Sequence, residues 1–129
     1  MLVLDSSALL AIFFKEPEGS AYRESIGRNQ CVISSPTYVE ISSVLDAKGS
    51  GAVAAYFDQF LEEYGISILD FTIEHAKIAR QSYREFGRGS ASKAKLNFGD
   101  TFSYALATFL KAPLLFKGAD FAHTDVRTL

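Results

Sequence analysis

The sequence between residues 96 and 107 reads Leu96-Asn97-Phe98-Gly99-Asp100-Thr101-Phe102-Ser103-Tyr104-Ala105-Leu106-Ala107. From Phe102 to Leu110, apolar side chains recur with the spacing of one helix face. The pattern predicts a packed helix with Asp100 in its first turn. Taken alone, an aspartate at this position is most simply a helix cap, because its carboxylate can accept backbone N–H groups. A functional role for Asp100 depends on whether other acidic residues arrive at the same place.

Short apolar runs alternate with pairs of helical segments along the rest of the chain. Buried strands are predicted at 2–4, 31–34, 66–70 and 113–116, and 124–126 is a candidate short edge strand. Because two helices separate each strand from the next, the strands should be parallel and covered by helices. We expect one domain over residues 1–129, an α/β fold built as a three-layer α/β/α sandwich around a parallel sheet of four or five strands.

One of the predicted helices begins with Thr72 as its cap and ends before Gly87. Its expected inner face consists of Ala76, Ala79, Tyr83 and Phe86. The two histidines of the chain, His75 and His123, lack metal-ligand spacing and are interpreted as structural or surface groups.

The composition is that of an ordinary globular protein, with 129 residues, 48% hydrophobic and 22% charged. The formal net charge is −2, so contact with a nucleic acid would need a local basic patch or a bound metal. Cys31 is the single cysteine, which excludes an internal disulfide. We see no signal peptide, membrane span, phosphate-binding glycine loop or serine nucleophile motif, and a reducing cytoplasm is the expected location.

Four carboxylates are predicted to meet at one edge of the sheet. Asp5 follows the first strand, Glu40 lies one turn into the helix after the second, and Asp120 follows the fourth. Asp100 begins the helix that leads into the fourth strand, and a parallel topology brings the start of that helix to the same edge. Each acid alone has a structural explanation as a cap, rim or turn residue. Crowded carboxylates repel unless a cation joins them, and oxygen ligands suit Mg²⁺ or Mn²⁺.

A small-residue loop with basic side chains precedes Asp100. Between Arg80 and Lys95 the chain carries five basic residues and one acid, Glu85, a local charge of +4. The loop is either a solvated surface segment or a contact for a phosphate backbone. The sequence leaves these two interpretations open.

Across nearly its whole length, the sequence resembles the PIN-domain ribonucleases of the VapC toxin type. The resemblance rests on four segments: residues 3–8 (VLDSSA), 37–40 (TYVE), 96–107 (LNFGDTFSYALA) and 113–121 (PLLFKGADF) followed by 124–126 (TDV). The third and fourth segments together are specific. The family commonly has asparagine or aspartate where this chain has Ala119.

The resemblance implies a metal-dependent endoribonuclease, the toxin of a toxin–antitoxin pair, that hydrolyses RNA phosphodiester bonds. The acidic quartet of the family matches Asp5, Glu40, Asp100 and Asp120, which would hold Mg²⁺ or Mn²⁺, and Asp125 is a nearby acid that could share the role of Asp120. Hydroxyl donors to the carboxylates are expected among three residues: Ser6, Ser7 and Thr101.

The resemblance also implies three kinds of partner: an RNA substrate, a small antitoxin protein, and a second copy of the chain in a homodimer. No membrane partner is expected. Two amphipathic helices are candidates for the dimer interface, although core packing is the favoured use of each taken singly. Their apolar residues are Val53, Phe57 and Tyr64 in one helix and Tyr38, Ile41 and Leu45 in the other.

Two other classes of protein remain as alternatives. A different metal phosphohydrolase, such as a haloacid-dehalogenase-like phosphatase, would need Asp-x-Asp after the first strand, whereas Ser6 and Ser7 follow Asp5. The second alternative is a non-catalytic module, either a degenerate nuclease or a receiver-like domain. In a receiver-like domain, Asp70 could be the acceptor aspartate and Lys117 the lysine after the last strand. That second alternative leaves the placement of Glu40 and Asp100 unexplained.

Overall fold

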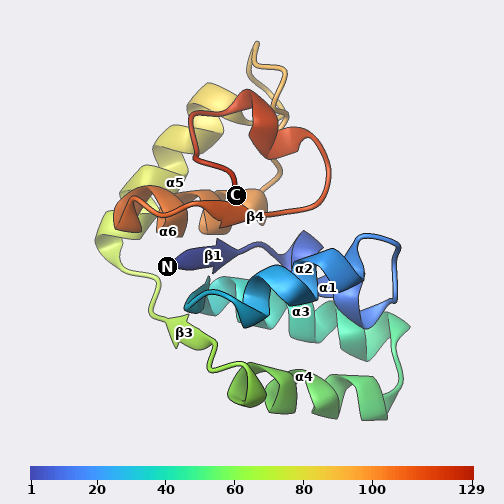
Figure 1. Cartoon of the computed structure of the whole chain (residues 1–129). Helices are drawn as coiled ribbons and strands as arrows, with labels where there is room; N and C mark the ends of the chain where they lie inside the picture. The colour runs from blue at the N-terminus through green and yellow to red at the C-terminus, as the bar shows by residue number, and fades with distance from the viewer.

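The computed structural model describes residues 1–129 and has a central sheet of four parallel strands with helices on both faces (Figure 1). The strands lie in the order β3-β2-β1-β4. Their bounds are β1 Leu2–Leu4, β2 Cys31–Ser34, β3 Ser67–Leu69 and β4 Leu114–Leu115. The three-layer parallel architecture expected from the sequence is confirmed.

Six α-helices and one 3₁₀ helix connect the strands. Four helices contribute to the layer on one face of the sheet, and α5 and α6 form the layer on the other (Figure 1). None of the helices is both long and apolar enough to cross a membrane. Their bounds are α1 Ser6–Phe13, α2 Gly19–Gly27, α3 Ser35–Lys48, α4 Gly51–Glu63, α5 Ile73–Phe86, α6 Asp100–Leu110 and η1 Asp120–His123.

Successive residues of each buried strand belong to two different hydrophobic cores. In β1, Leu2 and Leu4 pack with α1–α4, whereas Val3 packs with α6 and the C-terminal segment. Strands β2 and β4 alternate in the same way. Alternate side chains of a strand point to opposite faces, so a sheet covered on both faces is apolar at every position.

The central strands end together at one edge of the sheet. Val3 of β1 is in register with Val32 of β2 and with Leu114 of β4. Just past the strand, the Asp5 N–H donates to the Leu115 carbonyl at 3.0 Å. The residues that follow β1, β2 and β4 therefore emerge at a common edge.

The buried face of α5 differs from the predicted one. Ala79 and Phe86 are buried as expected, but Ala76 and Tyr83 are exposed, and the inward positions next to Ala79 are taken by His75 and Ser82. The apolar stripe is present, but part of it borders an open groove instead of the core. The histidine is buried, with its ring packed edge-on against a phenylalanine of α6.

The C-terminal segment also differs from expectation, because residues 124–126 form no strand. A single parallel bridge joins Leu114 to Thr128 instead. The Thr124 side chain accepts the Val126 N–H at 3.2 Å, and that local turn bends the segment where a strand would have to be extended.

Candidate acidic site at the strand ends

Asp5 is the most buried acid of the predicted quartet, with 2% of its surface exposed. It is the N-cap of α1, and its Oδ2 accepts the Ser7 N–H at 3.1 Å and the Ser7 hydroxyl at 2.6 Å. Its Oδ1 accepts the Ser103 hydroxyl of α6 at 2.6 Å. The cap therefore fixes a carboxylate at the end of the central strand, and the structural and functional interpretations of Asp5 are compatible.

Glu40 projects from α3 toward the first residues of α6. Its Oε1 is buried and has no hydrogen-bond partner. Burial raises the pKa of Glu40, and the negative charge of Asp5 raises it further, with Ser6 opposing the shift. A buried carboxylate oxygen without a donor is costly, and such a group calls for an explanation such as a catalytic role or a missing ion.

The carboxylate of Glu40 lies where Gly99 leaves space for it. A Cβ built on Gly99 would overlap Glu40 Oε2 and stand 3.0 Å from its Cδ. The backbone of Gly99 is helical, so the glycine is not required by its dihedral angles. Its role here is to provide room, which places Glu40 directly beside Asp100.

Asp100 occupies the first position of α6, and Gly99 precedes it as the N-cap. The Asp100 carboxylate accepts the Asn97 N–H at 2.9 Å, and the Asp100 N–H donates to the Asn97 side-chain oxygen at 2.8 Å. Asp100 is therefore not the N-cap itself but is the acidic member of a reciprocal pair of the capping-box kind with Asn97. The reciprocal pair fixes the orientation of the Asp100 carboxylate.

The pKa of Asp100 is raised to about 7, mainly by burial and also by the charges of Asp5, Asp120 and Glu40. The hydrogen bond from Asn97 opposes this shift. The carboxylate of Asp100 thus lies within the electrostatic reach of the three other acids in the predicted quartet. Perturbed carboxylates of this kind are concentrated at functional sites.

The two candidates for the fourth acid lie in different surroundings. Asp120 begins η1 and acts electrostatically on Asp100. Asp125 instead accepts a hydrogen bond from the Tyr104 hydroxyl and lines a separate hollow with Lys111 and Arg127. The charge of Asp120 on Asp100 supports Asp120, and the assignment of the fourth acid stays a prediction. Ala119, where the family commonly has a polar residue, immediately precedes Asp120 and is exposed.

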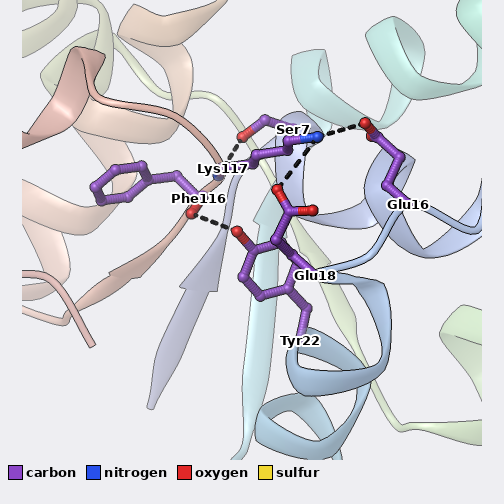
Figure 2. A network of polar contacts seen from close by, with 6 residues as sticks. All are labelled: Ser7, Glu16, Glu18, Tyr22, Phe116 and Lys117. Atoms are coloured by element: carbon purple, nitrogen blue, oxygen red, sulfur yellow. Dashed lines mark hydrogen bonds and ion pairs between the residues drawn. The ribbon is translucent and has the colours of Figure 1, made fainter.

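Ser7 connects the site to the loop that follows β4. Its hydroxyl donates to Asp5 and accepts the Lys117 N–H at 2.9 Å (Figure 2). The Lys117 ammonium is held by Glu16 and, at 3.3 Å, by Glu18. The positive charge of Lys117 is therefore paired with Glu16 and Glu18 and not with the acids of the predicted quartet. A receiver-like role for Lys117 with Asp70 is not supported.

The donor set fits a hard divalent cation. It consists of carboxylate oxygens, one of which is buried and unpaired, in a place where a glycine leaves room. No group of three or more Asp, Glu, His or Cys side chains is already arranged to hold one ion. The sharing of a single ion by Asp5, Glu40 and Asp100 therefore stays a prediction.

Two supporting residues were not identified from the sequence. Ser103 lies three residues after Asp100, on the same helix face, and that spacing could have indicated it. Asn97 makes two hydrogen bonds with Asp100: its N–H donates to the Asp100 carboxylate, and its side-chain oxygen accepts the Asp100 N–H. By contrast, Thr101 donates to the Phe98 carbonyl at 2.6 Å and not to a carboxylate.

The basic side chains before Asp100 make no ion pairs. The salt bridges of the molecule involve Arg28 and Lys117 only. Two of the basic residues, Arg80 and Arg84, line a groove between α5 and α6 that also reaches Phe98. The cationic segment is therefore available to an external anion.

The sequence matches the PIN domain family over residues 2–127. Ribonuclease VapC42 of Mycobacterium tuberculosis is 39% identical over 127 residues, which cover 98% of this chain and 97% of that protein. Ribonuclease VapC28 of the same species is 38% identical over 127 residues, with coverage of 98% and 96%. These similarities extend over essentially the whole length of both proteins.

Solved structures share the fold at low sequence identity. VapC20 of Mycobacterium tuberculosis, described as a Sarcin-Ricin loop cleaving toxin, superposes with a TM-score of 0.80 at 11% identity and covers 100% of this chain and 98% of its own. VapBC2 from Rickettsia felis, bound to a DNA fragment from its promoter, gives a TM-score of 0.74 at 16% identity, with coverage of 99% and 96%.

Proposed function

Because the chain belongs to the PIN-domain family, among the relatives of the VapC ribonucleases, we infer that it is an endoribonuclease and the toxin of a toxin–antitoxin pair. We propose further that its activity requires Mg²⁺ or Mn²⁺ and that Asp5, Glu40, Asp100 and Asp120 hold the ion. The observation that carries this finer proposal is the unpaired, buried Glu40 Oε1 beside an Asp100 whose pKa is raised to about 7.

A divalent cation bound at these carboxylates would lower the pKa of water and offset the charge that develops on the phosphate. Asp5 is suited to be a metal ligand, because hydrogen bonds from the Ser7 and Ser103 hydroxyls hold its two carboxylate oxygens in one orientation. Asn97 does the same for Asp100 through its N–H. These donors limit the rotation of the two carboxylates.

Glu40 is the acid best suited to handle a proton. Its Oε1 has no donor and can accept a hydrogen bond from the attacking water. In the hydrolysis, a bond forms between the water oxygen and phosphorus, and Glu40 takes the proton that the water loses. One P–O ester bond breaks, and the leaving ribose oxygen takes a proton from solvent. Burial raises the pKa of Glu40, which makes it a stronger base than an ordinary carboxylate.

The proposed function is tested with purified protein and a structured RNA. We expect cleavage with added Mg²⁺ or Mn²⁺, none with a chelator, and none from Asp100→Asn in either condition. Asparagine keeps the size of the side chain and an oxygen that can accept the Asn97 N–H, so the variant should remain folded by circular dichroism. Full activity of Asp100→Asn would remove Asp100 from the catalytic site.

We propose a small antitoxin protein as partner, homodimeric assembly and action in the cytoplasm. One of the solved neighbours is described as a toxin–antitoxin complex from Klebsiella pneumoniae, and it supports the first of these. The two helices considered for a dimer interface pack against each other, with the Tyr38 and Phe57 rings stacked at 5.4 Å. Core packing is the use of these helices that the structure shows.

A further inference from the structure

We propose that the groove between α5 and α6 is an RNA subsite next to the acidic site, in which Phe98 and Phe102 stack a base and Arg80 and Arg84 contact phosphates. The proposal rests on the proposed ribonuclease function and adds to it the part of the molecule that holds the strand. It assigns a use to a loop and groove that the acidic quartet leaves unexplained.

The groove has a volume of about 440 Å³ and an aromatic rim. Phe98 is 72% exposed, so its apolar aromatic ring is accessible to a ligand. Its ring packs edge-on against Phe102 at 5.0 Å, and Phe102 in turn packs against Phe71 at 5.2 Å. The exposed ring is thus supported from behind, which holds it in place as a stacking platform.

The same two phenylalanines border the acidic site. A second hollow, of about 420 Å³, is lined by Glu40 and Gly99 together with Phe98 and Phe102. The two hollows therefore meet at the aromatic pair. A strand with one phosphate at the carboxylates would pass directly over Phe98 into the groove.

The charge of the groove suits a polyanion. Its lining contains Arg80 and Arg84 and no acidic residue, and neither arginine is in a salt bridge. Guanidinium groups pair with phosphate, and aromatic rings stack on bases of any sequence. A purely apolar protein segment would leave both arginines without partners, so the lining favours a single-stranded nucleic acid.

The test measures RNA binding in the Asp100→Asn background, so that the RNA is not cut. The probe is a 12-nucleotide single-stranded RNA that carries 2-aminopurine, whose fluorescence falls when the base stacks. With Phe98→Ala we expect roughly ten-fold weaker binding and a loss of the fluorescence change, since one stacked base is worth about that factor or more. Phe98→Tyr, which keeps an aromatic ring, should retain both the affinity and the fluorescence change of the parent. Phe14→Ala, at an exposed phenylalanine in the layer across the sheet, is the matched control.

The arginines are tested through the salt dependence of the same binding. Each phosphate contact to a single strand contributes about 0.7 to the slope of log K against log salt. The double variant Arg80→Gln, Arg84→Gln should therefore reduce the slope by roughly 1.4. Lys77→Gln, an exposed residue of α5 outside the groove, should leave it unchanged.

The outcomes separate this proposal from the proposed function. Unchanged affinity and fluorescence in Phe98→Ala would overturn the subsite and leave a protein segment as the occupant of the groove, even if the parent protein cleaves RNA. Failure of the parent protein to cleave any RNA would refute the ribonuclease function, whereas the binding measurements would still decide the subsite.

Discussion

At the scale of single residues, the acidic site is a place where burial works against ionisation. Asp100 is the clearest case, because its pKa is raised to about 7 by burial and by three neighbouring acids. Without a cation, ionised Asp100 must therefore destabilise the fold. A group whose folded pKa exceeds its unfolded pKa stabilises below the unfolded value and loses that contribution as the pH rises through the folded value.

We therefore expect Asp100→Asn to be more stable than the parent in the presence of chelator, by a margin that is small at pH 5 and grows as the pH rises to 8 through the folded pKa of Asp100. The upper limit of the gain is set by about 1.4 kcal/mol for each unit of the pKa shift. The measurement is urea unfolding of both proteins between pH 5 and pH 8. If Asp100 mainly served the helix dipole, the charged parent would instead be the more stable protein at pH 8.

The fourth acid gives a second prediction at this scale. Asp120→Asn should lower cleavage of RNA at limiting Mg²⁺, because Asp120 acts electrostatically on Asp100. Asp125→Asn should retain the activity of the parent, because Asp125 is paired with Tyr104 away from that carboxylate. Cleavage rates are measured for both variants over a range of Mg²⁺ concentrations. The reverse pattern would assign the fourth position to Asp125.

The sequence could predict the four acids as a group because their positions follow from topology, with each one after a strand or near a helix start. It could not identify Ser103, whose hydroxyl lies on a helix face that reads as core. A small polar residue on a packed face gives the same pattern whether it bonds its own helix or a distant carboxylate. Only the placement of α6 against β1 shows that Ser103 reaches Asp5.

At the scale of elements, the approach of α3 to the start of α6 determines where Glu40 lies. Gly99→Ala should leave stability within about 1 kcal/mol, since the backbone there is helical and the overlapping group is the end of a flexible side chain. Cleavage should fall strongly, because Glu40 must move out of the place that its carboxylate occupies. Thermal unfolding and RNA cleavage are measured on the same preparation.

Gly51→Ala is the control for this prediction, because Gly51 is a helical glycine with nothing within 4 Å of the added Cβ. It should be as active as the parent. Full activity of Gly99→Ala would mean that the position of the Glu40 carboxylate is unimportant for the reaction.

Periodicity predicted the order of the elements and most of their bounds, because buried strands and capped helices leave local signals. It failed on the face of α5, where Ala76 and Tyr83 continue the apolar stripe but border the groove. An apolar stripe indicates which side of a helix is apolar. It does not show whether that side is buried in the core or lines a groove open to solvent. The error lies where we propose that RNA binds.

At the scale of the whole molecule, the two hydrophobic cores share the strands that separate them. Leu4 and Ile33 face one core, and Val3 and Val32 face the other. If one core unfolded, the shared strands would lose packing on one face, and the other core depends on those same strands. We propose that residues 1–129 form one cooperative domain.

The two cores should therefore open with the same free energy, and each carries a probe. Cys31 is fully buried in the first core, and burial raises the pKa of its thiol to about 11, so a thiol reagent should react only after opening. Amides of α6 around Leu106 and Ala107 report on the second core by hydrogen exchange. Both free energies should equal that of global unfolding in urea. A thiol that reacts through a distinctly smaller opening than the α6 amides would show that the α1–α4 layer unfolds by itself, and the chain would then not be a single cooperative unit.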